Sequence, residues 1–152
     1  MKVGTLTDPN NCTTFRTKQL ARYIARLYDA EFAHAGMKST QYSLLTHVLN
    51  RGPMSSGELA DRLGVEASTL TRSLRVLQAS GYVAVTEGQD ARVRVVTLTA
   101  SGKKAQAKAH IHWLAAQQRL TAVLGVELVL ALHNVMEACT EKLRDFQGSK
   151  PG

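Results

Sequence analysis

The sequence predicts a mainly α-helical fold with a small β-hairpin, and three observations in the middle of the chain predict it. Apolar residues recur at helical spacing in two short segments, 55–63 and 67–80. Strand-forming residues then occupy 82–86 and 92–99, on either side of a turn-forming stretch at 87–91. Helix, tight turn, helix and hairpin, in this order, make a winged helix-turn-helix.

Two helices are expected before this segment. Residues 1–12 are polar and contain a proline, so we expect a flexible arm there. Apolar residues at helical spacing predict a first helix over 13–35 and a second over about 39–51. Met54 is expected to add a very short third strand beside the hairpin.

The first helix of the helix-turn-helix begins with a capping box. Ser55 precedes it and Glu58 stands three residues later, so each side chain can bond the other residue's backbone N–H. Gly64 is expected to end this helix, because glycine adopts the left-handed conformation at little cost.

The second helix of the pair has two distinct faces. Its leucines at 70, 74 and 77 share one face and are expected to point inward. The opposite face carries short hydroxyl side chains and two guanidinium groups, at Ser68, Thr71, Arg72 and Arg75. Such groups suit base edges and phosphates, so we interpret this helix as one that enters the major groove of DNA.

The hairpin is expected to carry a cationic tip. Gly88 and Asp90 supply turn chemistry, and Arg92 follows directly. Asp90 is two residues from Arg92, so we expect its carboxylate to hold the Arg92 guanidinium. For Arg94, a contact to the DNA backbone and a structural salt bridge are equally favoured.

Two long helices should follow the hairpin. The first begins at Thr99 or Ser101, Gly125 interrupts the pattern, and the last runs from Val126 to about Phe146. Their apolar stripes, with that of the first helix, exceed what one small core can cover. We therefore expect a twofold homodimer rather than a monomeric bundle.

These elements predict one domain that is flanked by the N-terminal arm and a C-terminal tail. The domain is expected over 13–146, with its winged-helix part at about 39–102 and its dimerisation helices at 13–35 and 100–146. A loose tail is expected over 147–152.

Composition narrows the class of protein. The 152 residues carry a formal net charge of +7, which favours an anionic partner. Two cysteines form neither a disulfide framework nor a metal motif, and the five histidines match no known metal set. We expect no cofactor, no metal and no enzymatic activity. With no apolar run long enough to span a bilayer, we expect no membrane and a cytoplasmic location.

Two motifs resemble those of the MarR family of bacterial regulators. The segment D-A-R-V-R-V-V-T-L-T-A-S-G, residues 90–102, is similar to that family's wing-plus-helix signature, and E-L-A-D-R-L-G-V-E-A-S-T-L-T-R, residues 58–72, is similar to its helix-turn-helix. The resemblance covers roughly residues 15–146. It implies a homodimer that binds pseudo-palindromic operator DNA and represses transcription, although operator position decides between repressor and activator.

The resemblance and the polar faces together give a set of expected DNA-contacting residues. On the helices and the wing, they are Ser55, Ser68, Thr69, Thr71, Arg72, Arg75, Asp90, Arg92 and Arg94. In the family, the residue that matches Arg92 enters the minor groove, whose narrow A·T-rich segments attract guanidinium groups.

Two kinds of control are implied, because members of the family respond to small aromatic acids or to oxidants. A pocket for a small aromatic or phenolic ligand is expected where the first two helices meet the fifth, with candidates Tyr28, Phe32, Tyr42, His47, His112 and Trp113. Cys12, near the start of the first helix, is the candidate oxidant sensor, with Arg16 one turn later to lower its pKa.

A winged helix that binds a protein instead of DNA is a further alternative. It would need an exposed apolar patch where Ser68, Arg72 and Arg75 stand, and the polar face argues against it.

Overall fold

The computed structural model describes residues 6–148, and the expectations for residues 1–5 and 149–152 fall outside that range. Within it the chain forms six α-helices, three short strands and one 3-10 turn, which confirms the mainly α fold with a small β wing. The helices are α1 (Thr13–Phe32), α2 (Ser39–Arg51), α3 (Ser56–Leu63), α4 (Ala67–Ala79), α5 (Ala100–Leu124) and α6 (Val126–Gly148). The other elements are η2 (Pro9–Asn11), β1 (Met54–Ser55), β2 (Val83–Glu87) and β3 (Arg94–Leu98).

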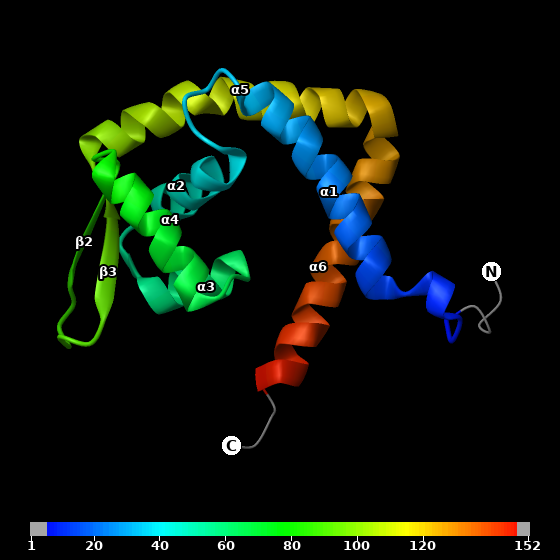
Figure 1. The fold of residues 1–152 in the computed structure, drawn as a ribbon, viewed down its shortest axis with the longest axis horizontal. Coiled ribbons are helices and arrows are strands. Elements are labelled where there is room, and N and C mark those ends of the chain that lie inside the picture. Colours follow the sequence, from blue (N-terminus) through cyan, green and yellow to red (C-terminus); the bar gives the residue numbers. More distant parts are fainter. Residues whose placement is uncertain (1–5, 149–152) are drawn as a thin grey trace.

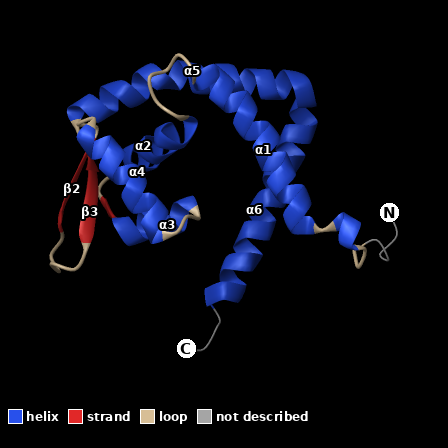
Figure 2. Cartoon of the chain, viewed as in Figure 1, coloured by secondary structure: helices blue, strands red, loops and turns tan. Residues whose placement is uncertain are grey.

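The elements gather into two regions that α5 joins. Figure 1 shows the β2–β3 hairpin, α3 and α4 on one side, with α1 and α6 on the other. We call residues 39–99 the winged-helix lobe, and α1, α6 and the second half of α5 the helical arm. The strands are confined to the outer edge of the lobe (Figure 2). They form one antiparallel sheet in the order β1-β3-β2, with Met54 opposite Val96 and Val83 opposite Leu98.

Local hydrogen bonds explain where α3 begins and ends. The hydroxyl oxygen of Ser55 accepts from the backbone N–H of Glu58 at 3.1 Å, and Glu58 Oε2 accepts from the backbone N–H of Ser55 at 3.2 Å. The predicted capping box is therefore confirmed. Gly64 closes the helix in the left-handed conformation, at φ 63°.

Two element boundaries differ from those predicted. α1 ends at Phe32 instead of about Ala35, because the chain enters a turn in which the N–H of Ala35 donates to the carbonyl of Phe32. The second strand of the hairpin begins at Arg94 instead of Arg92, because Asp90 holds Arg92 in the turn. Part of the predicted arm has regular structure, since Asp8 caps the single turn of η2.

A tightly packed apolar core fills the winged-helix lobe. Its fully buried side chains come from four elements that are distant in sequence: Leu45 and Val48 of α2, Leu59 of α3, Leu77 of α4 and Val96 of β3. A second, smaller cluster of Phe32, Tyr42 and Ala109 joins α1, α2 and α5. The lobe thus has a core of its own, and a separate aromatic cluster attaches it to the helical arm.

A compact joint fixes the start of α5 to the turn between α4 and β2. Thr99 Oγ1 accepts from the N–H of Gly102 at 2.9 Å and donates to the carbonyl of Gly81 at 2.6 Å. A Cβ on Gly102 would lie 2.0 Å from the carbonyl oxygen of Tyr82, so a side chain does not fit there. The threonine and glycine of the L-T-A-S-G segment therefore hold α5 against the lobe.

No single helix within residues 6–148 is long and apolar enough to cross a membrane. Together α5 and α6 have sufficient length and hydropathy, but they meet at an angle of 106°.

Candidate nucleic-acid interface and ligand cavity

The outward face of α4 presents the polar side chains that the sequence predicted. Leu70, Leu74 and Leu77 are buried against the lobe. The side chains on the opposite face are exposed, and these are Ser68, Thr69, Thr71, Arg72 and Arg75. The structure therefore brings the five predicted residues of this helix onto one solvent-facing surface. Of the large apolar side chains of α4, Val76 alone is exposed, so this surface is not an apolar docking patch.

One hydroxyl group of this face, and that of the neighbouring Ser73, are already bonded within the helix. Thr71 Oγ1 donates to the carbonyl of Ala67 at 2.8 Å, and the side chain of Ser73 makes the same kind of bond to Thr69. The Thr71 oxygen keeps its acceptor capacity for an incoming donor. Arg72 and Arg75 form no ion pair with any residue that the structure describes, so their guanidinium groups are available to an outside partner.

The wing projects a free arginine from the end of the hairpin. Arg92 lies in the turn between β2 and β3 and is exposed. The turn is closed by the N–H of Gly88, which donates to the carbonyl of Val93 at 2.8 Å. Arg94 lies at the start of β3, opposite Glu87, and forms an ion pair with it at 3.9 Å. Because both of these side chains are well exposed, that pair contributes little to stability.

The sequence predicted the wrong hydrogen-bond partner for Asp90. Asp90 Oδ1 accepts from the backbone N–H of Arg92 at 2.9 Å, and the Arg92 guanidinium is not its partner. An aspartate two residues before an N–H readily forms this local turn, whereas reaching the end of a long arginine side chain would fix several rotatable bonds. Asp90 therefore shapes the backbone of the tip and leaves the guanidinium free.

Ser55 lies at the junction of β1 and α3 and is half-buried. Its hydroxyl group is occupied in the capping box, which is a structural role.

A cavity of about 510 Å³ lies between α1, α2 and α5, where a ligand pocket was predicted. Four aromatic side chains contribute to its wall, and these are Tyr28, Phe32, Tyr42 and Trp113. The remaining lining residues are polar, with no lysine, arginine or carboxylate among them: Ser39, Ser43, Thr46, His47, Asn50 and His110. We call it the α1–α2–α5 cavity. Burial raises the pKa of the Tyr28 phenol, whose O–H donates to Gln117 Oε1 of α5.

The histidine that lines this cavity from α5 is His110, which sequence reasoning missed, instead of the predicted His112. Tyr42 Oη and His110 Nδ1 are 2.7 Å apart, and the rings of His110 and Trp113 stack with centroids 5.4 Å apart. His112 lies on another side of α5, with its ring 6.3 Å from that of Phe32. The i, i+3 spacing of His110 and Trp113 was the available signal, because residues at that spacing share a helix face.

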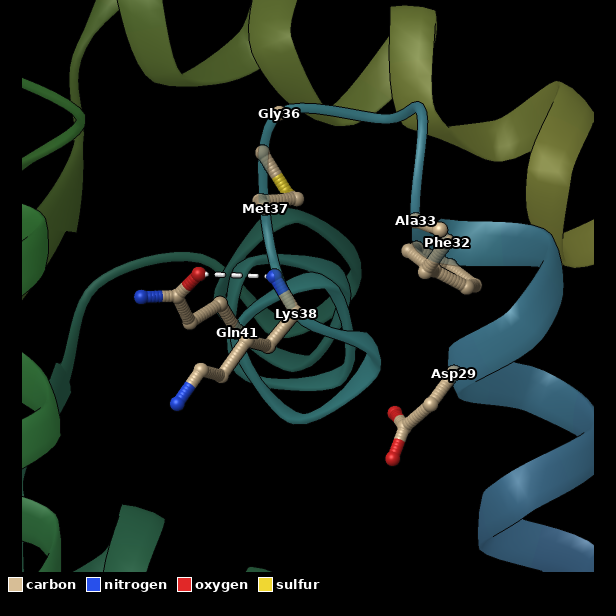
Figure 3. Close-up of a pocket in the computed structure, with 7 residues that line it drawn as sticks. All are labelled: Asp29, Phe32, Ala33, Gly36, Met37, Lys38 and Gln41. Atoms are coloured by element: carbon tan, nitrogen blue, oxygen red, sulfur yellow. Dashed lines mark hydrogen bonds between the residues drawn. The ribbon is translucent and has the colours of Figure 1, made fainter.

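A second hollow, of about 590 Å³, lies at the connection between α1 and α2 (Figure 3). Phe32 borders both hollows, but this one is charged, since Asp29 and Lys38 line it. Gln41 Oε1 accepts from the backbone N–H of Lys38 at 2.8 Å, which fixes the start of α2. We call it the Lys38 hollow.

Both cysteines are exposed in the chain. Cys12 precedes the first residue of α1, and the Arg16 guanidinium that was expected to act on its thiol instead donates to Asn11 Oδ1. Cys139 lies on α6, which packs on its own chain near its start, where Val129 is buried. Residues 6–148 contain no cluster of metal-ligating side chains.

An exposed polar helix and a cationic hairpin on one lobe define a winged helix-turn-helix nucleic-acid-binding protein. Residues 35–92 match the model of the MarR family. The chain is 33% identical over 104 residues to the HTH-type transcriptional regulator YwoH of Bacillus subtilis (strain 168), a match that spans 68% of this chain and 76% of that protein. The chain therefore belongs to the MarR family and is a transcriptional regulator.

Solved structures give the same result. The M. tuberculosis transcriptional regulator MosR in complex with DNA is 35% identical and superposes with a TM-score of 0.69 over 84% of this chain and 98% of that one. A mutant MarR from E. coli complexed with operator DNA superposes with a TM-score of 0.75 over 91% of this chain and 99% of that one. At 20% identity the second match supports the fold alone.

Proposed function

We propose that the chain works as a homodimer that binds pseudo-palindromic duplex DNA and represses transcription until a small aromatic ligand releases it. The observation that carries the DNA-binding part is the joint exposure of α4 and the wing tip on one lobe. In this proposal α4 enters the major groove, with Arg72 and Arg75 at base edges or phosphates, and Arg92 enters the neighbouring minor groove.

The helical arm supports the homodimer. In α6, Val129 alone among its 23 residues is buried, although the helix carries many large apolar side chains. Those exposed in the chain are Val126, Leu128, Leu130, Val135, Met136, Leu143 and Phe146. Phe15, Leu20 and Tyr23 of α1 are exposed in the same way. An apolar surface of this extent on one chain calls for a protein partner, and a second copy supplies the twofold arrangement that a palindromic site requires.

The α1–α2–α5 cavity supports the ligand-controlled part. It lies between the lobe and the arm, so a molecule that fills it changes how the two regions pack. A cavity of this volume, with aromatic walls and a few polar groups, has the usual character of a small-molecule site. Release of DNA then requires that the ligand bind the non-DNA-binding arrangement more tightly than the DNA-binding one.

One observation favours the oxidant-sensing alternative: Cys12 is exposed at the N-terminus of α1, where an oxidant can reach its thiol. Peroxide titration of DNA binding separates the two modes of control. Loss of binding in the wild type but not in Cys12→Ser would support the cysteine, and equal sensitivity would remove it.

The experiment for DNA binding is protection mapping on the protein's own promoter, followed by gel-shift titration of the protected duplex. We expect two protected half-sites about one helical turn apart and an affinity that falls steeply with salt, because bound phosphates release counterions. A double variant, Arg72→Ala with Arg75→Ala, should lose the footprint. Protection unchanged in that variant would contradict the assigned role of α4.

A further inference from the structure

We propose that the α1–α2–α5 cavity selects neutral planar aromatic molecules that carry hydrogen-bonding groups, such as phenols and aromatic amides, over aromatic carboxylates. This inference rests on the proposed ligand-controlled function and adds to it the charge of the ligand. The inference differs from the aromatic acid that the family resemblance implies. The residues that line the cavity support it.

The lining contains no permanent charge. Among the described residues that border the cavity there is no lysine, arginine, aspartate or glutamate. A carboxylate that leaves water is stable in such a site only with a cation or several directed donors to replace its hydration. One lining residue is bonded to a negative charge, because Ser39 Oγ donates at 2.8 Å to Asp29 Oδ1. An anionic ligand is therefore penalised twice, by desolvation and by repulsion.

The cavity already disfavours negative charge on one of its own groups. Burial raises the pKa of the Tyr28 phenol, whose O–H donates to Gln117. The same desolvation acts on a phenolate or carboxylate that a ligand would bring, and a neutral phenol avoids it.

The wall has a shape that suits a flat ring. The Trp113 ring stacks on the His110 ring at an interplanar angle of 14° and on the Tyr42 ring at 26°. These three rings from adjacent helices line the cavity in nearly parallel planes, and an aromatic ligand can stack parallel to them.

The two histidines offer complementary hydrogen-bonding groups. Tyr42 is buried and its hydroxyl lies 2.7 Å from His110 Nδ1; the arrangement that leaves no buried O–H unpaired has the phenol donating and Nδ1 accepting. His110 therefore carries its proton on Nε2, as a donor. His47 Nδ1 lies 2.8 Å from the carbonyl of Ser43, so there Nδ1 holds the proton and Nε2 is the acceptor. A ligand with both an acceptor and an O–H or N–H donor matches this pair.

A positive charge is available in the neighbouring hollow. The Lys38 hollow supplies an ammonium group and shares Phe32 with the cavity. An aromatic carboxylate that bound this lobe would be better accommodated there. The test must therefore distinguish the two hollows.

The experiment compares 4-hydroxybenzamide with 4-hydroxybenzoate at pH 7 by isothermal titration calorimetry on the full chain. The two probes share a ring and a hydroxyl group and differ in the charge of one substituent. We expect the amide to bind at least about tenfold tighter than the carboxylate. His110→Gln should weaken the amide, whereas Lys38→Gln should leave it unchanged.

A second variant places a cation in the cavity. Asn50 borders it and is exposed, so Asn50→Lys should fold and should raise the affinity for 4-hydroxybenzoate until it equals or exceeds that for the amide. Unchanged discrimination in Asn50→Lys would contradict the electrostatic argument.

The outcomes separate the inference from the function on which it rests. If the carboxylate binds wild type as tightly as the amide and releases DNA, the charge inference fails and ligand control stands. If binding of either probe is lost in Lys38→Gln but not in His110→Gln, the site is the Lys38 hollow and the inference fails. If neither probe binds or changes the gel shift, both the inference and an aromatic ligand in this cavity fail.

Discussion

The winged-helix lobe and the helical arm differ in how much of their apolar surface the chain itself covers. In the lobe, leucines from α2, α3 and α4 are fully or almost fully buried, and Leu59 is 0% exposed. In the arm, Leu130 and Leu143 of α6 are 55% and 60% exposed. Leucine side chains therefore stabilise the lobe within one chain, whereas those of α6 are left exposed by their own chain. The difference teaches that the lobe completes its core within one chain, whereas the arm leaves apolar surface for the proposed second copy.

The largest expected effect sets a core leucine of the lobe against an exposed leucine of the arm. Leu59→Ala should lower the free energy of unfolding by about 2–5 kcal/mol, because it leaves a cavity in a closed core. Leu130→Ala should lower it much less at low protein concentration and should instead weaken self-association. Thermal melts at several concentrations, with sedimentation, measure both. Equal losses of unfolding free energy in the two variants, at every protein concentration, would contradict the difference between lobe and arm.

The joint between the two regions should be the next most sensitive point. Gly102→Ala places a Cβ against the Tyr82 carbonyl and should destabilise the protein by roughly 1–3 kcal/mol. Gly57→Ala is the matched control, because its Cβ would meet nothing closer than 3.9 Å and the site lies within α3. The control should stabilise the helix by about 0.5–1 kcal/mol. Chemical denaturation of both variants checks the contrast, and similar behaviour would mean that the joint tolerates a side chain.

Arg92 should affect function without affecting folding. Arg92→Ala should weaken specific DNA binding at least about tenfold, since such a contact is worth ~1–3 kcal/mol, with an unchanged melting temperature. Arg94→Ala removes an equal charge from the same hairpin, and we expect a smaller loss because Arg94 lies in β3 opposite Glu87 and not in the turn at the tip. Gel-shift titration at one salt concentration compares them. Equal losses would indicate a general charge effect in place of an Arg92 contact.

The smallest effect is expected at the cap of α3. Ser55→Ala removes the hydroxyl that accepts from Glu58 and should cost about 1 kcal/mol of stability. Ser55→Thr keeps the acceptor and should recover most of that loss. If Ser55→Ala melts normally but binds DNA weakly, the hydroxyl acts at a phosphate and its structural role is minor.

Features that depend on neighbouring residues were predictable from the sequence. The Ser55–Glu58 box, the end of α3 at Gly64 and the alternation of buried leucines with polar residues on α4 all depend on separations of a few residues. Asp90 marks the limit of such reasoning. The turn was predicted, but the sequence did not show whether the carboxylate would bond the Arg92 side chain or its N–H.

The composition of the cavity was less predictable. His110 and His112 are two residues apart and so differ by on the order of 200° around the helix. Which of them faces α1 and α2 depends on how α5 is rotated, and that is set by the packing of α5 against those helices, where Ala109 joins Phe32 and Tyr42 in one buried cluster. The helical pattern alone could not choose between them.

The sequence by itself determined the helices and strands to within a few residues, the caps of α3, the polar face of α4 and the membership of the family, because these are properties of short segments. The tertiary structure decided which histidine borders the cavity, that its lining is uncharged and where the unburied apolar surface lies. These depend on contacts between residues far apart in the chain, such as Tyr42 and His110, which are 68 positions apart. A local pattern constrains each helix but not the rotation at which two helices meet.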